Sequence, residues 1–184
     1  QFAWLNQVHG QTIITASTDG QIVSADGSDT IENNLACVVM TADCLPVLLC
    51  DQAGTKVSAV HAGWRGLAGG ILQKAVQRFP DPSQVMVWLG PAISQAHFEV
   101  GSDVYQAFVA NNPQNNSAFT PSETPNKWMA DIYHLARLQL KLAGIDKIYG
   151  GQYCTYADKK HFYSYRRDGL ESGRMASLIW LNAD

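Results

Sequence analysis

Short apolar runs separated by polar turns recur along most of this 184-residue chain. Runs of about four to eight residues bounded by Gly, Asp or Pro are typical of β-strands. Continuous apolar character indicates strands covered on both faces of a sheet. The most continuous runs lie at 36–40, 46–50, 57–60 and 85–89. Shorter runs at 2–8, 12–16, 148–153 and 175–181 predict further strands around this central set.

Three segments have the spacing of apolar residues that predicts an amphipathic helix. They lie at 71–79, 103–109 and 130–143. Ser102 is the expected N-cap of the second helix, and Gly144 is expected to end the third. The third helix has the clearest apolar face, which is expected to point inward and comprises Ile132, Leu135, Ala136, Leu138 and Leu142.

Two polar segments interrupt this pattern. Residues 25–29 combine Asp, Gly and Ser, a composition that favours a bend in the chain over helix capping or ion binding. Residues 111–127 are rich in Asn, Pro, Ser and Thr and predict a long surface loop. Because strands and helices follow one another in mixed order, we expect a single α+β domain over residues 1–184. Its core would be a mixed β-sheet or sandwich surrounded by helices.

Composition argues against several classes of protein. Hydrophobic residues make up 46% of the chain, enough for a substantial core, and the formal net charge of −3 gives no indication of a nucleic-acid partner. The apolar runs are too short and too interrupted to span a membrane. The four cysteines form no C-x-x-C pair, and two of them lie in predicted buried strands. This setting predicts reduced thiols and a cytoplasmic location.

Cysteine and histidine recur where predicted strands begin or end. His9 follows the first apolar run, Cys44 directly precedes another, and His61 follows a third. Catalytic zinc sites use three protein ligands of these types and leave a fourth position open. We therefore expect the three side chains to converge on one metal ion, with zinc as the cofactor. Each of them taken alone would be an ordinary packed or surface residue.

The segment after His61 predicts a second kind of chemistry. Gly63 and Gly66 lie in a glycine-rich turn before a helical stretch, where backbone N–H groups attract anions. Arg65 adds a guanidinium that suits phosphate. The alternative is that these glycines only allow tight packing of strand against helix. Arg166, in a late cluster of arginines and tyrosines, is the second candidate for phosphate binding, and a solvated surface turn is its alternative interpretation.

Longer motifs are spread over nearly the whole chain. They are Asn6–Gly10, Thr41–Val47, His61–Gly66, Leu89–Ile93, Phe98–Gly101, Tyr163–Asp168 and Gly173–Ser177. Together they resemble the YfiH-type family. That family was long described as multicopper polyphenol oxidase or laccase, and is now described as purine nucleoside phosphorylase with adenosine deaminase activity.

The resemblance implies a zinc site on His9, Cys44 and His61, and a β-sandwich surrounded by helices and related to bacterial cysteine-dependent toxin domains. It also implies phosphate and purine nucleosides (adenosine, inosine, guanosine and methylthioadenosine) as small-molecule partners. Asp43, next to Cys44, is a candidate proton shuttle for deamination. Family members usually carry a Ser-Thr-Arg-Gly-Gly-like stretch and an Asn-Leu-Gly segment. Neither occurs here, so we expect that the domain lacks an N-terminal segment.

Three alternatives remain open at this point. Cys44 as nucleophile and His61 as base would make a cysteine hydrolase, for example an amidase that edits peptidoglycan. Copper also accepts His and Cys ligands, which is the basis of the polyphenol oxidase alternative, although five histidines are few for a multicopper centre. The third alternative is a protein that is not an enzyme, in which zinc only stabilises the fold.

Overall fold

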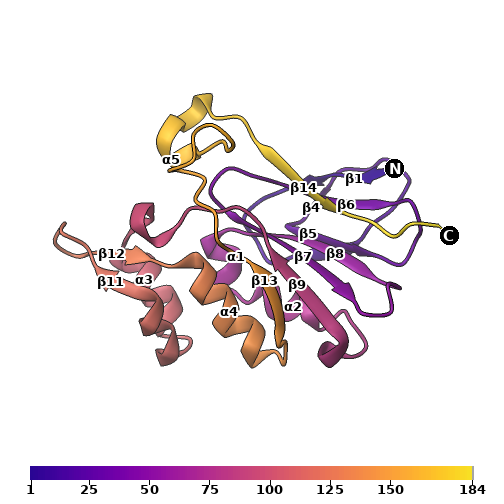
Figure 1. Cartoon of the computed structure of the whole chain (residues 1–184), viewed down its shortest axis with the longest axis horizontal. Helices are drawn as coiled ribbons and strands as arrows, with labels where there is room; N and C mark the ends of the chain where they lie inside the picture. The colour runs from indigo at the N-terminus through magenta and orange to yellow at the C-terminus, as the bar shows by residue number, and fades with distance from the viewer. Residues whose placement is uncertain (184) are drawn as a thin grey trace.

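The computed structural model describes residues 1–183 and has a six-stranded mixed sheet at its centre (Figure 1). In order across the sheet, the strands are β13 (Lys147–Gly150), β9 (Val85–Leu89), β7 (Leu45–Asp51), β8 (Val57–Ala62), β5 (Gly27–Thr30) and β3 (Ile13–Thr15). β7 pairs antiparallel with both β8 and β9, whereas the outermost strands β13 and β3 run parallel to their neighbours.

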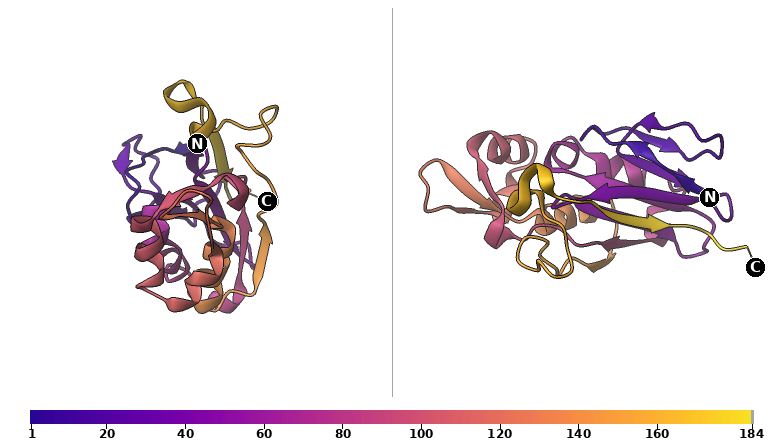
Figure 2. Two further views of the ribbon diagram at one scale, coloured as in Figure 1. Left: turned by 90° about the vertical axis from the view of Figure 1, so that its left-hand side faces the viewer. Right: turned by 90° about the horizontal axis from the view of Figure 1, so that it is seen from above.

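A second sheet and a layer of helices cover the two faces of this sheet (Figure 2). The second sheet consists of β1 (Phe2–Ala3), β6 (Ala36–Thr41) and β14 (Met175–Ile179), and the helices are α1 (Trp64–Ala68), α2 (Ile71–Val76) and α4 (Ile132–Leu142). Successive residues of β8 show why its apolar run is continuous. Ala59 packs with Cys37 and Val39 of the second sheet, whereas Val60 packs with Leu72 and other helical side chains. The predicted α+β sandwich with surrounding helices is confirmed.

The predicted long loop at 111–127 is wrong, because much of it has regular structure. Residues 113–118 form a 3₁₀-helix, and β11 (Phe119–Pro121) pairs with β12 (Lys127–Ala130), which also pairs with β10 (Glu99–Gly101). The ring of Tyr105 in α3 (Ser102–Val109) stacks on Trp128 at 4.0 Å between centroids and meets Phe119 edge to face at 5.2 Å. This aromatic cluster orders a segment whose composition favours a loop.

Local details of two helices differ from expectation. The N-cap of α3 is Gly101 and not Ser102, whose hydroxyl donates to the carbonyl oxygen of Asn126 instead. Leu142 is 64% exposed, because it is the last residue of α4 and lies beyond the part of the helix that packs on the sheet. Gly144, with a left-handed φ of 86°, follows the end of α4 as predicted.

Residues 25–29 do not form a simple bend, because β5 begins at Gly27 and is buried along its length between β3 and β8. Asp29 is buried in this strand with its carboxylate paired to Lys56 at 2.9 Å and to Arg78 at 2.7 Å. Pairing satisfies a charge that a strand interior would otherwise disfavour.

The remaining elements are short. They are β2 (Leu5–Asn6), which pairs parallel with β4 (Val23–Ser24), α5 (Tyr165–Asp168), and 3₁₀ turns at Pro82–Gln84, Gln95–His97 and Gly169–Glu171. Among residues 1–183, no helix combines the length and the apolar character needed to cross a bilayer.

Candidate metal centre and substrate cavity

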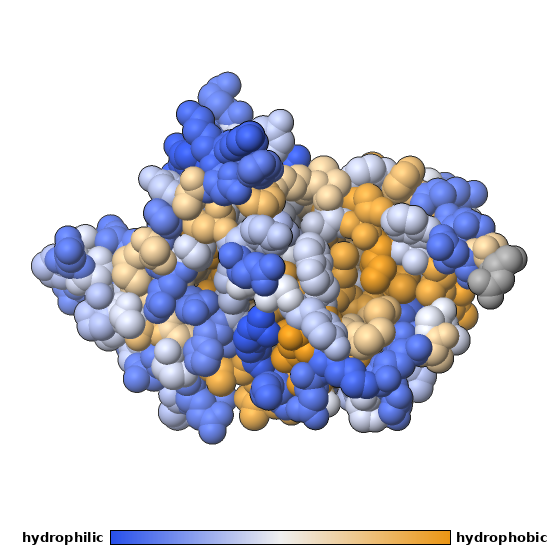
Figure 3. Space-filling view, in the orientation of Figure 1, coloured by the Kyte–Doolittle hydropathy of each residue, from blue (hydrophilic) through white to orange (hydrophobic). Residues whose placement is uncertain are grey.

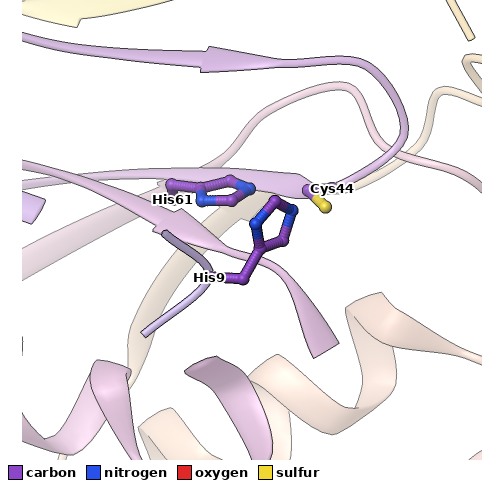
Figure 4. Close-up of side chains that lie close together, drawn as sticks. All are labelled: His9, Cys44 and His61. Carbon is purple, nitrogen blue, oxygen red and sulfur yellow. The ribbon is translucent and has the colours of Figure 1, made fainter. Parts of the chain in front are cut away.

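Three side chains from distant parts of the sequence meet at one end of the sandwich (Figure 4). His9 follows β2, Cys44 lies in the turn from β6 to β7, and His61 belongs to β8. Their candidate donor atoms all lie within 4.8 Å of one another, and the two imidazole rings meet edge to face with centroids 4.8 Å apart. The structure therefore brings together the three residues that the sequence pattern singled out as metal ligands.

Strand register and one unusual turn produce this convergence. In the antiparallel pair of β7 and β8, Pro46 lies opposite His61, which places Cys44 at the same end of the sheet. His9 has a φ of 59°, in the left-handed region that residues other than glycine and asparagine seldom adopt. Such a conformation persists where its surroundings determine it, which directs attention to what holds the His9 backbone.

The residue that holds it is Asp26, which sequence reasoning placed in a bend. Its carboxylate accepts hydrogen bonds from the backbone N–H of His9 at 2.8 Å and of Gly10 at 2.6 Å. It also lies 2.8 Å from Nδ1 of His61, and the side chain is fully buried. A carboxylate on Nδ1 fixes the tautomer of an imidazole and leaves Nε2 free for a metal. One buried carboxylate thus positions two of the three candidate ligands.

The electrostatics of the cluster favour a thiolate beside an imidazole. Burial opposes ionisation of Cys44, but hydrogen bonds and charge from His61 and His9 outweigh it and lower the pKa of the thiol to about 7. Burial also opposes protonation of His61, but Asp26 and Cys44 together raise its pKa to about 9. The pKa of Asp26 is lowered, because the His61 and backbone hydrogen bonds exceed the effect of its burial.

This donor set fits a divalent cation of the zinc type. One thiolate and two imidazoles, with one imidazole oriented by a carboxylate, are the ligands and the supporting contact typical of catalytic zinc sites. Exposure decreases from His9, which is exposed, through Cys44 to His61, which is buried. The cluster is therefore open to solvent on the His9 side.

Gly63 and Gly66 pack against this cluster and bring α1 close to it. A Cβ atom on Gly63 would lie 3.0 Å from Cδ2 of His9 and 3.2 Å from Sγ of Cys44. A Cβ on Gly66 would lie 2.5 Å from the carbonyl oxygen of Gly10, closer than a real side chain allows. These contacts favour the tight-packing interpretation of the glycines over anion binding.

A cavity of about 630 Å³ lies against the candidate ligands. Its lining includes His9, Cys44 and His61, and a second group of residues, most of them C-terminal, that we call the C-terminal wall. That wall combines aromatic rings with two guanidinium groups, from Phe98, Tyr165, Arg166 and Arg174. The guanidinium of Arg166 lies 5.7 Å from the ring centroid of Phe98, and that of Arg174 lies 5.7 Å from the ring centroid of Tyr165.

Asp43 ties this C-terminal wall to the metal centre. Its carboxylate accepts hydrogen bonds from the Thr155 hydroxyl at 2.6 Å, the Ser164 hydroxyl at 3.1 Å and the backbone N–H of Arg166 at 2.6 Å. Asp43 directly precedes Cys44 and has a φ of 85°. The segment around α5, the upper protrusion in Figure 3, has a mostly hydrophilic surface on the side shown. The hydrogen bonds to Asp43 help to attach it.

The two arginines that the sequence proposed for phosphate binding lie in different places. Arg166 lines the cavity and donates from its guanidinium to the carbonyl oxygen of Glu99 at 3.0 Å. Arg65 is exposed on α1, with its guanidinium 4.5 Å from the centroid of the Trp64 ring. Within the described chain, Arg65 is not among the residues that line the cavity.

Comparison with known proteins identifies the family. Residues 1–182 match the family model described as multi-copper polyphenol oxidoreductase laccase. The chain is 49% identical over 180 residues to purine nucleoside phosphorylase PA4543 of Pseudomonas aeruginosa, covering 97% of this chain and 74% of that protein. It is 47% identical over 180 residues to purine nucleoside phosphorylase YfiH of Escherichia coli, covering 97% and 73%.

Solved structures show the same fold. Protein NMB0706 of Neisseria meningitidis superposes with a TM-score of 0.95 at 50% identity, over 99% of this chain and 75% of that one. Protein YfiH of Bacillus licheniformis superposes with a TM-score of 0.91 at 28% identity, over 98% and 74%. Because the family model covers residues 1–182 and several relatives are well above 30% identical over most of their length, the chain belongs to the YfiH family.

Proposed function

We propose that this protein is a zinc-dependent purine nucleoside phosphorylase that also deaminates adenosine. The observation that carries the proposal is the cavity in which a His–Cys–His cluster faces a wall of aromatic rings and guanidinium groups. Relatives that are 49% and 47% identical carry the name purine nucleoside phosphorylase. The substrates that we propose are adenosine, inosine, guanosine and methylthioadenosine.

His9, Cys44 and His61 would hold the zinc ion, and Asp26 would orient His61 and the His9 backbone. When bound, zinc supplies Lewis-acid chemistry that makes an oxygen nucleophile available near neutral pH. The exposed side of the cluster, at His9, faces the cavity, where a purine ring would lie.

Phosphorolysis requires positive charge next to the attacking phosphate, and the wall opposite the metal supplies it. Arg166 and Arg174 present planar guanidinium groups, which match the oxygens of phosphate in pairs. Phe98 and Tyr165 provide aromatic surface on which a purine base stacks. We assign phosphate binding to Arg166 in preference to Arg65, because Arg166 faces the cavity.

Asp43 has a different role in this proposal from a proton shuttle. Both of its carboxylate oxygens already accept hydrogen bonds, one from Thr155 and the other from Ser164 and Arg166. We therefore assign Asp43 to positioning the arginine wall beside the metal.

One measurement tests the main proposal. Protein with a measured zinc content is incubated with adenosine, with and without phosphate, and adenine is separated from inosine. Phosphorolysis predicts adenine only when phosphate is present, whereas deamination predicts inosine in both cases. Zinc-loaded protein that forms neither product would contradict the proposal.

The arginine assignment has a matched pair of variants. Arg166→Ala is expected to raise the KM for phosphate about tenfold, since a hydrogen bond to a charged group contributes about 1.5–3 kcal/mol. Arg65→Ala removes an exposed guanidinium of the same charge and is expected to change that KM by less than about twofold. An effect of Arg65→Ala as large as that of Arg166→Ala would transfer the role to Arg65.

One observation favours a second candidate, a cysteine hydrolase. Cys44, with a pKa lowered to about 7, lies beside an imidazole that is oriented by a carboxylate, an arrangement that also activates a nucleophilic thiol. A hydrolase of this kind would keep its activity after metal removal and lose it on alkylation of Cys44. The zinc enzyme would lose its activity in the chelator.

Copper is the alternative metal, since the matched family model is described as a multi-copper oxidoreductase. Multicopper chemistry needs several metal sites, and among residues 1–183 the structure has one cluster of metal-ligating side chains. Metal analysis of protein purified without added copper separates the two: we expect close to one zinc per chain.

A further inference from the structure

Cys154 forms a second cysteine–histidine pair, outside the metal centre. Its Sγ atom lies 3.6 Å from Nδ1 of His97, and both residues are partly buried. The ring of Tyr156 stacks on the His97 imidazole at 4.6 Å between centroids, with an interplanar angle of 25°. The stacking holds the imidazole beside the sulfur, so this pair has a defined geometry.

Backbone N–H groups also surround this sulfur. The N–H of Ser94 donates to Sγ at 3.4 Å. Burial opposes ionisation of Cys154, but hydrogen bonds from Ser94 and from the backbone of Ala157 and Tyr156 lower the pKa of its thiol. Thiols in such electropositive, partly exposed settings are the reactive ones. Cys37 and Cys50 differ, because burial raises the pKa of each.

A second cavity of about 540 Å³ opens at Cys154. Arg137 and Asp131 lie in its lining together with Ser94 and Gln95, so its surface is polar and includes one group of each charge. The guanidinium of Arg137 donates to the carbonyl oxygen of Gly150 at 2.6 Å, which fixes its position. The cavity is large enough for a small peptide-like group attached to the sulfur. Within the described residues, His97 and Cys154 do not belong to a cluster of three metal-ligating side chains, which disfavours a second metal site.

We propose that Cys154 is a site of reversible modification by small peptide-like disulfides, which form a mixed disulfide with its thiolate. The thiolate attacks one sulfur of the disulfide, a new sulfur–sulfur bond forms at Cys154, and the original sulfur–sulfur bond breaks. The other half leaves as a thiolate and takes a proton from water. Cys154 is oxidised, the released half is reduced, and the cavity accommodates the attached half, with Arg137 and Asp131 near its charged ends.

The modification is coupled to the first cavity through two contacts, and this part rests on the proposed function. The residue after Cys154, Thr155, donates its hydroxyl to Asp43. The carbonyl oxygen of His97 lies 3.4 Å from the guanidinium of Arg166, which lines the first cavity. An adduct on Cys154 displaces His97 and Thr155, and therefore disturbs the position of Arg166. We expect the KM for phosphate to rise.

Mass spectrometry of the modified cysteines is the primary test. Zinc-loaded wild-type protein is treated with glutathione disulfide, quenched with acid at intervals, digested and mapped at all four cysteines. Cys154 is expected to react about tenfold faster than Cys50, in accord with its larger thiolate fraction, and dithiothreitol should remove the adduct.

Two further variants complete the test. Cys154→Ser should keep its phosphate KM in glutathione disulfide, while the KM of the wild type rises several-fold. His97→Asn should slow the modification of Cys154. Equal rates at Cys154 and Cys50 would overturn the site, and a modified wild type with unchanged phosphate KM would overturn the coupling. The mapping needs no turnover, so a failure of the proposed nucleoside chemistry would leave the site proposal testable.

Discussion

The two walls of the main cavity each depend on one aspartate, but the two aspartates work in different surroundings. Asp26 lies next to a strand of the central sheet, fully buried, and contacts two candidate metal ligands, His9 and His61. Asp43 is buried in a turn and holds α5, a helix of only four residues. The first wall adjoins the central sheet. In the second wall, α5 is held by hydrogen bonds, and Arg174 directly precedes β14, which pairs with β6.

This difference indicates that metal binding and substrate binding are separable. His61 lies in β8, Cys44 lies one residue before β7, and buried Asp26 holds the backbone of His9. The geometry of the three candidate ligands therefore depends on the central sheet and on Asp26. Arg166 and Tyr165 belong to a segment with a hydrophilic surface, whose position depends on hydrogen bonds to Asp43 (Figure 3). We therefore expect substitutions on the Asp26 side to affect metal content, and substitutions on the Asp43 side to affect the KM for phosphate.

The largest effect is expected from Cys44→Ser. A hydroxyl replaces the thiolate that the two imidazoles stabilise, so the site loses its only sulfur donor. We expect zinc content to fall below about 10% and the rate of inosine phosphorolysis to fall at least about 100-fold. Loss of a residue that only supports a metal ligand already costs up to about 100-fold, so loss of a ligand itself should cost at least as much. Zinc content is measured by elemental analysis of the purified variant.

Cys50→Ser is the matched control, because Cys50 is a partly buried thiol in β7, six residues further along the chain. It contacts neither candidate histidine ligand, and burial raises the pKa of its thiol. Zinc content and activity should remain close to wild type. If Cys44→Ser kept its zinc, the assignment of the thiolate as a ligand would be wrong.

Asp26→Asn is expected to have the second largest effect. The amide keeps the shape of the carboxylate, but its NH₂ group is a donor and cannot accept a hydrogen bond. It would face either the backbone N–H groups of His9 and Gly10 or the Nδ1 of His61, so at least one hydrogen bond of Asp26 is lost. We expect zinc affinity to fall about 10–100-fold, as for other groups that orient a metal-bound histidine. Competition with a chromophoric chelator measures the affinity.

Asp29→Asn controls for loss of stability, since Asp29 is equally buried three residues further along the chain but pairs with Lys56 and Arg78. Both variants should unfold at lower temperature than the wild type, and only Asp26→Asn should bind zinc more weakly. Equal loss of zinc affinity in the two would show that Asp26 acts through the fold alone.

Sequence was sufficient for the ligands but not for the aspartate that orients them. His9, Cys44 and His61 each adjoin an apolar run, so strand ends could be recognised and their convergence expected. The family motifs then pointed to the same three residues. Asp26 lies in a segment whose Asp, Gly and Ser content favours turns, and its partners are 17 and 35 residues away in the sequence. Such partners are fixed by the pairing of β5 with β8, which composition does not reveal.

The arginines show the same limit at the other wall. Arg65 was the first candidate because it lies among glycines that precede a helix, a local pattern. In the structure these glycines permit close packing, and the guanidinium lies on the Trp64 ring. Arg166 reaches the cavity because Asp43, more than a hundred residues away in the sequence, holds its backbone. Local pattern identified the type of group required, and long-range contacts determined which residue supplies it.

Asp43→Asn is expected to have a smaller effect, confined to the substrate side. Asparagine tolerates the left-handed backbone conformation at this position, so the turn should be preserved. The charge that strengthens the hydrogen bonds from Thr155 and Arg166 is lost. We expect the KM for phosphate to rise about three- to tenfold with zinc content unchanged, measured by steady-state kinetics on the zinc-loaded variant.

The conservative substitution Thr155→Val removes only one of the three donors to Asp43 and should raise the same KM by less. If zinc content fell in Asp43→Asn, the separation between the two walls would be refuted. A KM equal to that of the wild type would instead show that α5 is held by other contacts.

The smallest effect is expected from protonation of Asp29 in acid. Unlike Asp26, which contacts two candidate ligands, Asp29 pairs with Lys56 and Arg78. Burial opposes its ionisation, but hydrogen bonds and charge from Arg78 and Lys56 outweigh it, so the pKa of Asp29 is lowered in the folded state. The ionised carboxylate of Asp29 therefore stabilises the folded state fully above the pKa of an unfolded aspartate, about 3.9. This stabilisation is lost progressively as the pH falls from that value through the lower pKa of the folded state.

Urea unfolding at pH 6 and at pH 3, in the presence of a chelator, measures this contribution. Between these two values the wild type should lose more stability than Asp29→Asn, by up to about 1 kcal/mol, because pH 3 lies about one pH unit below the pKa of an unfolded aspartate. Asp26 is present in both proteins, so its own titration cancels in the difference. If the two proteins lost stability in parallel, the pairs with Lys56 and Arg78 would contribute nothing to the fold, and this end of the sheet would be held by packing alone.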